Sequence, residues 1–405
     1  MLLVLAVAIT APLIARGQSA EQLKKAVVET GHLEFTRDVP IRYLTRNALN
    51  TYLRDIFERD YPRELSHKEA EFLTLMGYTR APIMLRELRR QIILENAGGL
   101  YNEKTKELVA LEEYRQIDMV NAMALVHELR HAIQDQRFNL AAILGDYSDF
   151  DDRRLAALAA IEGDATLVMI KQLGFDPDFF LRSFNMDSLL SLAPVLGQSS
   201  LTHAPAIIKS QLLMPYREGL AFSNSIFKQK SWPGVNRVLA APPQSTAQIL
   251  HPEKYFSGEA PRIVAMRMTP KGYTAYHSGV IGEYYLNALL QERAEDGGWA
   301  DVASGWRGDC FTIFKQAERN GTLLAWKSLW STEADAARFA AAFQHFLEKN
   351  FSVTLVVAQP DAGPILAGES AAGTFLLRQT GTSLFYARSA DRQTAHALLS
   401  TGILE

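Results

Sequence analysis

Apolar residues recur at three- and four-residue steps in several parts of the chain, and this spacing predicts amphipathic helices. The clearest case is residues 117–138, where Met119, Ala122, Val126, Leu129 and Ile133 follow the pattern. Asn47 and Ser66 are expected to cap two of the other helices. The predicted helices cover residues 47–59, 66–76, 117–138, 152–173, 280–293 and 333–348, with further helical stretches up to about residue 227.

Shorter runs of β-branched and aromatic residues, bounded by turn residues, predict strands. A hairpin is expected after Gly98, and its second arm, residues 107–111, directly precedes the helix at 117–138. The other predicted strands are 39–45, 262–268, 311–314, 323–330, 353–358 and 374–388, the last with a turn at Gly381. The Pro-rich passage at 240–252 is expected to be an ordered loop, followed by a domain boundary near Glu259. The pattern therefore predicts an α+β protein with domains at 21–259 and 260–405.

The first residues form a separate segment. Residues 2–15 are apolar but too few to span a bilayer, and polar residues follow at 16–20. This is typical of a signal peptide or of an N-terminal anchor that is not cleaved. We therefore expect an exported protein, either periplasmic, secreted or anchored. No other stretch of eighteen apolar residues occurs, so no further membrane span is expected.

Composition limits the partners and the metal chemistry. The formal net charge of −3 gives no basic surplus for binding phosphates, so nucleic acid is not an expected partner. The single cysteine, Cys310, excludes an intramolecular disulfide and a cysteine-rich metal site. Histidine and carboxylate side chains are left as possible metal ligands.

The sequence His127-Glu128-Leu129-Arg130-His131 is the strongest chemical motif. On a helix, two histidines four residues apart lie on one face and can bind the same ion. Glu128 beside them can take a proton from a zinc-bound water and so produce a nucleophile near neutral pH. By composition alone, the expected number of such motifs in this chain is about 0.01.

A catalytic zinc site needs a third protein ligand, and Glu162 is the best candidate. It lies on the apolar stripe of the helix predicted at 152–173, where an unpaired carboxylate would be costly and a cation would offset that cost. Asp164 is the weaker alternative, because it points to another side of the helix. The expected cofactor is one Zn²⁺ per chain.

Several stretches resemble exported bacterial metallopeptidase-like proteins of the gluzincin type, which share a His, His, Glu zinc set with thermolysin. These stretches are HELRHAIQDQ, IEGDA, PYREGLAF at 215–222 and PPQSTAQILHPEKY at 242–255. The resemblance implies a gluzincin-like catalytic domain, with His127, His131 and Glu162 as ligands and Glu128 as the general base. It also implies a peptide or protein substrate, aligned along residues 107–111 as an edge strand.

One position departs from the resemblance. Thermolysin-like enzymes have an aspartate four residues after the ligand glutamate to orient a histidine, whereas this chain has Thr166. Gln134 or Asp135, about one turn beyond His131, could take that role. The hydrolysis of a peptide also needs a donor to the developing oxyanion. His251, Tyr216 and Tyr255 are the candidates for it, although each taken alone fits a packing role better.

Two other functions fit the same sequence. The protein could be a catalytically inactive scaffold or binding protein of the cell envelope that retains zinc. It could also be a metal-free interaction protein whose function lies in the C-terminal domain. Substrate, oligomeric state and cleavage mode are not determined by the sequence.

Overall fold

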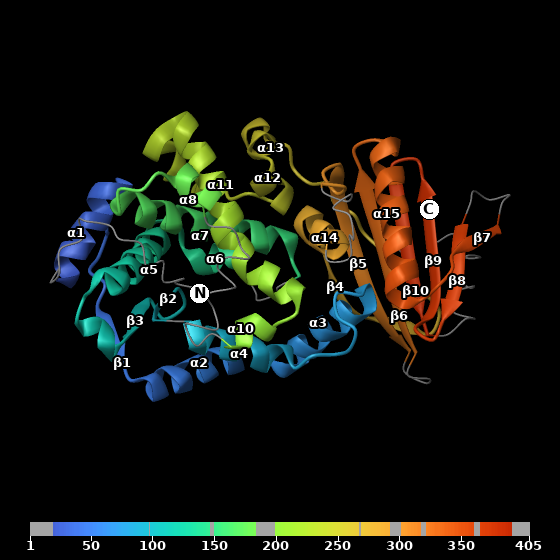
Figure 1. The fold of residues 1–405 in the computed structure, drawn as a ribbon, viewed down its shortest axis with the longest axis horizontal. Coiled ribbons are helices and arrows are strands. Elements are labelled where there is room, and N and C mark those ends of the chain that lie inside the picture. Colours follow the sequence, from blue (N-terminus) through green and yellow to red (C-terminus); the bar gives the residue numbers. More distant parts are fainter. Residues whose placement is uncertain are drawn as a thin grey trace.

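The molecule is elongated, with a helical region at one end and a large sheet at the other (Figure 1). The helical region ends with α13 (Pro252–Ser257), and the sheet begins with β4 (Tyr273–Gly279), on either side of the expected boundary at Glu259. No helix in the described part of the chain is long and apolar enough to cross a bilayer. The computed structural model describes residues 19–96, 98–145, 150–183, 199–266, 269–291, 301–316, 321–359 and 365–390.

The helical region is organised around α7 (Asp152–Gln172), which packs against α5 (Met119–Phe138) and α11 (Ala206–Val235). The residues of α7 itself are small or apolar on almost every face of the helix. A helix of this kind is stable only when it is buried. The remaining helices are α1 (Ala20–Gly31), α2 (Arg46–Asp60), α3 (Arg63–Met76), α4 (Leu85–Asn96), α6 (Leu140–Leu144), α8 (Pro177–Ser183), α10 (Ser199–His203) and α12 (Thr246–Leu250).

A small sheet in the helical region has the order β1-β3-β2. Its strands are β1 (Ile41–Leu44), β2 (Gly99–Asn102) and β3 (Glu107–Leu111). The expectation that residues 107–111 form an edge strand is wrong, because β1 pairs in parallel with β3 and places it in the middle. The outer strand beside α5 is β2. Pairing with a segment more than sixty residues earlier in the chain is not visible in local sequence patterns.

The second sheet has seven strands in the order β4-β5-β6-β10-β9-β8-β7, with every pair antiparallel. α15 (Glu333–Phe351) lies across one face of it (Figure 1). Aromatic side chains fill the space between helix and sheet, with Phe343 packing against Trp326 and Tyr386. The other strands are β5 (Trp306–Gln316), β6 (Thr322–Trp330), β7 (Val356–Gln359), β8 (Ile365–Ser370), β9 (Gly373–Thr380) and β10 (Ser383–Ser389).

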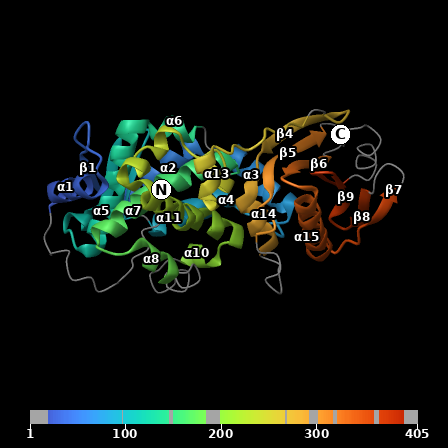
Figure 2. The same ribbon diagram turned by 90° about the horizontal axis from the view of Figure 1, so that it is seen from above.

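The two regions share one hydrophobic core, which runs from Leu23 in α1 to Tyr386 in β10. α3 and α14 (Gly282–Gln291) lie between them, as the view from above shows (Figure 2). Phe72 of α3 stacks on Phe311 of β5, with ring centroids 4.0 Å apart. The predicted boundary near Glu259 is thus a change of architecture within a continuous core.

The mixed α+β class is confirmed, but several local predictions are wrong. Thr45 and Pro62 stand at the N-cap positions predicted for Asn47 and Ser66, so these helices begin earlier. Residues 262–266 form no strand, and the Pro-rich passage contains the short helix α12. The predictions for residues 1–18, 267–268 and 292–293 lie outside the described residues.

Candidate metal centre

The helix that carries the HELRH motif has well-defined ends. At its start, the side chain of Asp118 accepts a hydrogen bond from the backbone N–H of Asn121, which satisfies one of the free donors of the first turn. At its end, Asn139 adopts a left-handed conformation, with φ of 57°. Between these ends α5 is almost entirely buried, so His127 and His131 are presented inside the protein.

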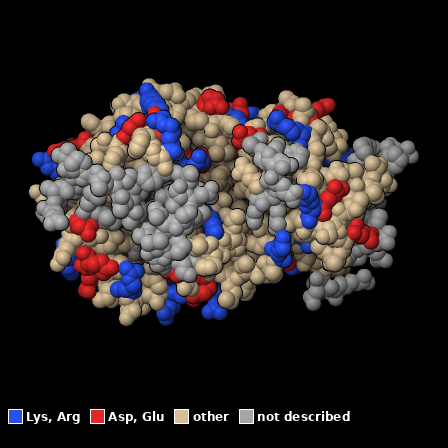
Figure 3. Space-filling model, in the orientation of Figure 1, with Lys and Arg blue, Asp and Glu red and all other residues tan. Residues whose placement is uncertain are grey.

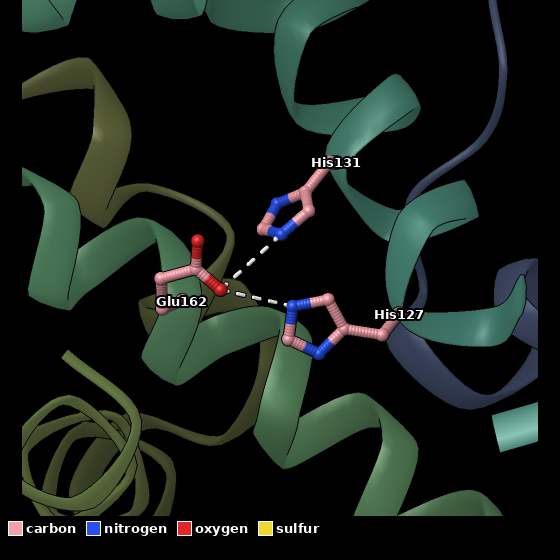
Figure 4. A group of neighbouring side chains, drawn as sticks. All are labelled: His127, His131 and Glu162. Atoms are coloured by element: carbon pink, nitrogen blue, oxygen red, sulfur yellow. Dashed lines mark hydrogen bonds and ion pairs between the residues drawn. The ribbon is translucent and has the colours of Figure 1, made fainter. Parts of the chain in front are cut away.

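Glu162 on α7 faces both histidines (Figure 4). Its Oε2 lies 3.0 Å from Nε2 of His127 and 3.4 Å from Nε2 of His131. All three side chains are buried. The three residues proposed as ligands from the sequence therefore come together from two helices.

The donor set and its spacing fit zinc. Ligand atoms about 2.0–2.2 Å from a tetrahedral Zn²⁺ lie about 3.3–3.6 Å from one another. Of the two distances from Glu162, 3.4 Å falls in this range and 3.0 Å is slightly shorter, and the three ligand atoms all lie within 4.8 Å of one another. The Nε2 of His131 is buried and makes no well-aligned hydrogen bond with a described residue, but Glu162 faces it at 3.4 Å. A metal ion between these two atoms would satisfy the nitrogen.

The protonation states also suit metal binding. Burial, together with the neighbouring His131, lowers the pKa of His127 to about 4, so that its imidazole is neutral and able to bind a metal. Burial opposes ionisation of Glu162, yet the pKa of this carboxyl lies well below its usual range, in part because both histidines pair with it. Burial also opposes the charged form of His131, but Glu162 and Glu128 raise the pKa of this histidine, so His131 would release a proton on binding a metal.

Glu128 is held beside the candidate ligands by β2. Its Oε2 accepts a hydrogen bond of 2.6 Å from the backbone N–H of Tyr101. Its Oε1 is buried and accepts no hydrogen bond from any residue that the structure describes. Burial raises the pKa of Glu128 to about 7, so the carboxyl can both take and release a proton near neutral pH.

Gln134 is the residue that orients His131. Its Oε1 lies 2.8 Å from Nδ1 of His131, and its Nε2 donates to the carbonyl of Ile161 and to Asp164. Thr166, which stands where thermolysin-like enzymes have an aspartate, has a buried hydroxyl without a hydrogen-bond partner within the described ranges. Of the two alternatives from the sequence, Gln134 therefore contacts the histidine.

Asp164 is bound to Arg130 in a buried, two-pronged ion pair, with distances of 3.0 and 2.9 Å. Arg130 also donates to the side chain of Asn236 at 2.6 Å. Asp164 thus anchors α5 to α7, and Gln134 connects it to His131. Sequence reasoning missed Arg130, although an arginine at an interior position of the motif helix is itself an indication of a buried partner.

Two glycines let α11 approach α7 at the level of the candidate ligands. A Cβ atom on Gly163 would overlap the backbone of Gly219, and one on Gly219 would overlap the backbone of Ala159. Only glycine permits this close approach. It also brings Tyr216, one turn before Gly219, over His127, with ring centroids 6.1 Å apart. The stretches IEGDA and PYREGLAF therefore meet at the site.

A cavity of about 200 Å³ opens beside the candidate ligands. Glu162 and Tyr216 line it on one side, and β2 lines it on the other. Much of the remaining lining is apolar and comes from α2, α4, α6, α7 and α11: Leu53, Ile56, Phe57, Ile93, Leu144, Leu155, Leu158 and Leu212.

The other sequence candidates lie away from the histidines. Asp135 accepts hydrogen bonds from the hydroxyl of Tyr101 and from Lys106, so it supports β2. His251 lies 2.6 Å from Glu283 of α14 and joins the helical region to the sheet region. The Tyr255 hydroxyl donates to the carbonyl of Ala241. Among the three oxyanion candidates, only Tyr216 lies beside the candidate ligands.

The sequence profile of one family, described as a domain of unknown function (DUF8575), matches residues 271–399. These residues contain the seven-stranded sheet and α15 and exclude the three candidate ligands. Neither the curated proteins nor the solved structures give a significant match. Support for the metal centre therefore comes from the geometry of His127, His131 and Glu162.

Proposed function

We propose that the protein is a zinc-dependent peptidase of the gluzincin type. The observation that carries this proposal is the buried Glu128, whose Oε1 has no hydrogen-bond partner among the described residues and which is adjacent to a buried His127, His131, Glu162 group. A carboxylate that serves only the fold is expected to have its hydrogen bonds satisfied. One that transfers protons needs an oxygen left open for the reactants.

His127, His131 and Glu162 would hold the ion. When bound, zinc supplies Lewis acidity that activates water and polarises a carbonyl group. Glu128 takes a proton from the attacking water and passes it to the leaving amine, and its pKa of about 7 suits both transfers. Tyr216 is the proposed donor to the oxyanion, because it lies over His127 and lines the adjoining cavity.

A substrate would lie along β2, the outer strand of the small sheet. Alternate residues of such a strand turn their N–H and C=O groups away from the neighbouring strand. The N–H of Tyr101 is one of these groups and reaches Glu128, so the open edge of β2 runs past the base. The apolar cavity beside it would accept an apolar side chain of the peptide.

The test is peptide cleavage by the zinc-loaded protein, measured by mass spectrometry on a mixture of synthetic decapeptides that carry apolar residues at varied positions. We expect Glu128→Gln to lower the cleavage rate about 10³-fold while zinc content is unchanged. Tyr216→Phe should lower it by about 10²-fold. Glu64→Gln changes an exposed carboxylate on α3 and is the matched control.

Cleavage that survives in Glu128→Gln would contradict the proposed base. A wild-type protein that binds zinc but cleaves none of the peptides would instead favour the inactive zinc-binding scaffold.

A further inference from the structure

A second and larger hollow lies on the helical region, with a volume of about 840 Å³. It is an open groove between the first turn of α7, the last turns of α11, the passage before α12, and α13. Its size falls in the range of ligand-binding clefts, roughly 300–1,000 Å³. We refer to it as the α11–α13 groove.

The α11–α13 groove is separate from the candidate metal centre. Arg153 lines it and lies nine residues before Glu162 on the same helix. Nine residues make about two and a half turns, so the two side chains leave α7 on opposite faces, about 14 Å apart along its axis. The groove and the apolar cavity therefore lie on different sides of α7.

The charges along the groove are of one sign. Among the described residues that line it, three are basic and none is acidic: Arg153, Lys230 and Arg237. All three are exposed. Arg153 and Arg237 form no side-chain ion pair with any described residue, and Lys230 lies over the ring of Phe256 at 5.1 Å. The two arginines are thus available to an anionic ligand.

A break in α11 forms one wall of the groove. Ser231 has φ of 52° and ψ of −161°, a conformation that is costly for any residue other than glycine. Pro233 and Gly234 follow it and line the groove, while Trp232 is buried and packs against Phe227. The strained turn directs the end of α11 over the groove, and packing of Trp232 helps to hold it there.

The opposite wall comes from the stretch at 242–255, which the metal centre does not use. Pro242, Gln248 and Tyr255 all line the groove. The hydroxyl of Tyr255 donates to the carbonyl of Ala241, and the amide of Gln248 donates to the carbonyl of Glu259. These hydrogen bonds fix the wall, which offers apolar and aromatic surface between the cationic side chains.

We propose that the α11–α13 groove binds a polypeptide segment rich in Asp or Glu with apolar residues between them. Exposed guanidinium groups bind carboxylates in two-pronged contacts, and the prolines and aromatic rings contact apolar side chains. A long polyanion would need an extended basic surface. The described face in Figure 3 instead has acidic and basic side chains interspersed, and the net charge is −3. This binding is independent of the metal and of peptide hydrolysis.

The test measures fluorescence anisotropy of a labelled octapeptide, Glu-Glu-Phe-Glu-Glu-Phe-Glu-Glu, added to the full chain. The Glu128→Gln variant is used as the reference protein, so that the probe cannot be consumed. We expect saturable binding that the double substitution Arg153→Gln and Arg237→Gln weakens at least tenfold. The control is the double substitution Lys25→Gln and Arg338→Gln, which removes the same charge from exposed positions outside the groove.

Three results would overturn the proposal. These are no binding of the octapeptide, equal binding by the two double variants, and equal binding of an octapeptide with lysine in place of glutamate. A heparin oligosaccharide is also added as a competitor. If it displaces the probe at the same concentration as an unlabelled octapeptide does, the proposed preference of the groove for a polypeptide is overturned. Because every arm is measured with metal chelated, failure here leaves the proposed peptidase activity untouched.

Discussion

Each of the two regions contains a buried carboxylate, on a strand of the seven-stranded sheet in one and on the motif helix α5 in the other. The two carboxylates differ in the number of hydrogen bonds that they accept. Asp309 in the sheet region accepts four hydrogen bonds, from the backbone N–H groups of Ile281 and Gly282 and from the indoles of Trp306 and Trp326. Glu128 in the helical region accepts one.

Burial raises the pKa of both carboxyls, so burial alone does not distinguish them. The distinction lies in the Oε1 of Glu128, which has no hydrogen-bond partner in the described part of the chain. A fully bonded carboxylate fixes the structure around it, whereas a partly bonded one is free to exchange a proton. The comparison separates a residue kept for the fold from one proposed for chemistry.

The largest expected difference between the two regions is in stability. We expect Asp309→Ala to lower the free energy of unfolding by about 3–5 kcal/mol, because it leaves four buried N–H groups without an acceptor. Glu128→Gln should leave stability unchanged or slightly higher, since a buried carboxylate is replaced by a neutral amide. Urea unfolding followed by circular dichroism measures both. If both variants lost the same free energy of unfolding, the distinction between Asp309 as a structural carboxylate and Glu128 as a chemical one would be wrong.

A smaller effect is expected at the residue that orients His131. Gln134→Leu removes the contact with Nδ1, and zinc affinity should fall about 10- to 100-fold. Thr166→Val is the control, because the Thr166 hydroxyl has no hydrogen-bond partner among the residues described and its loss should leave zinc affinity unchanged. Competition with a chelating dye measures both constants. If Thr166→Val lowered zinc affinity more than Gln134→Leu, the position four residues after Glu162 would be the one that supports the site.

The smallest expected effect concerns the contact between regions. The hydrogen bond to Glu283 raises the pKa of His251, so the charged form of this histidine is stabilised in the folded protein. That contribution is fully present below the unfolded pKa of about 6.5 and is lost as pH rises through the folded pKa.

His251→Gln should therefore destabilise the protein by about 1–2 kcal/mol at pH 5.5 and by less at pH 9. Thermal unfolding of both proteins at the two pH values tests this, with Glu64→Gln as the control at an exposed carboxylate whose ion-pair partner is Lys68. A loss that is the same at both pH values would mean that the charge on His251 contributes nothing.

The sequence allowed the helices and the three candidate ligands to be predicted, because both depend on local spacing. His127 and His131 are one turn apart, and Glu162 lies on an apolar stripe that is visible in the residues around it. Buried positions on predicted helices can be assigned before the fold is known. Glu162 is therefore found without knowledge of how α5 and α7 pack.

The features that could not be predicted from the sequence depend on contacts between segments that are far apart in the chain. The pairing of β1 with β3 moves the open edge from β3 to β2, and nothing near residues 107–111 indicates it. The bond from Tyr101 to Glu128 and the ion pair of Arg130 with Asp164 also link separate elements. Gly163 and Gly219 indicate in the sequence that another segment approaches closely, since glycine inside a predicted helix often marks such a contact. They do not indicate which helices meet.

The central claim is that His127, His131 and Glu162 form one zinc site. The most direct test is elemental analysis of the purified full-length protein beside His131→Ala and Glu162→Ala. We predict one zinc per chain in the wild type and its loss from both variants, with each variant shown to be folded by circular dichroism. A wild-type protein without zinc after purification in zinc-supplemented buffer, or full zinc retention in folded Glu162→Ala, would contradict the account.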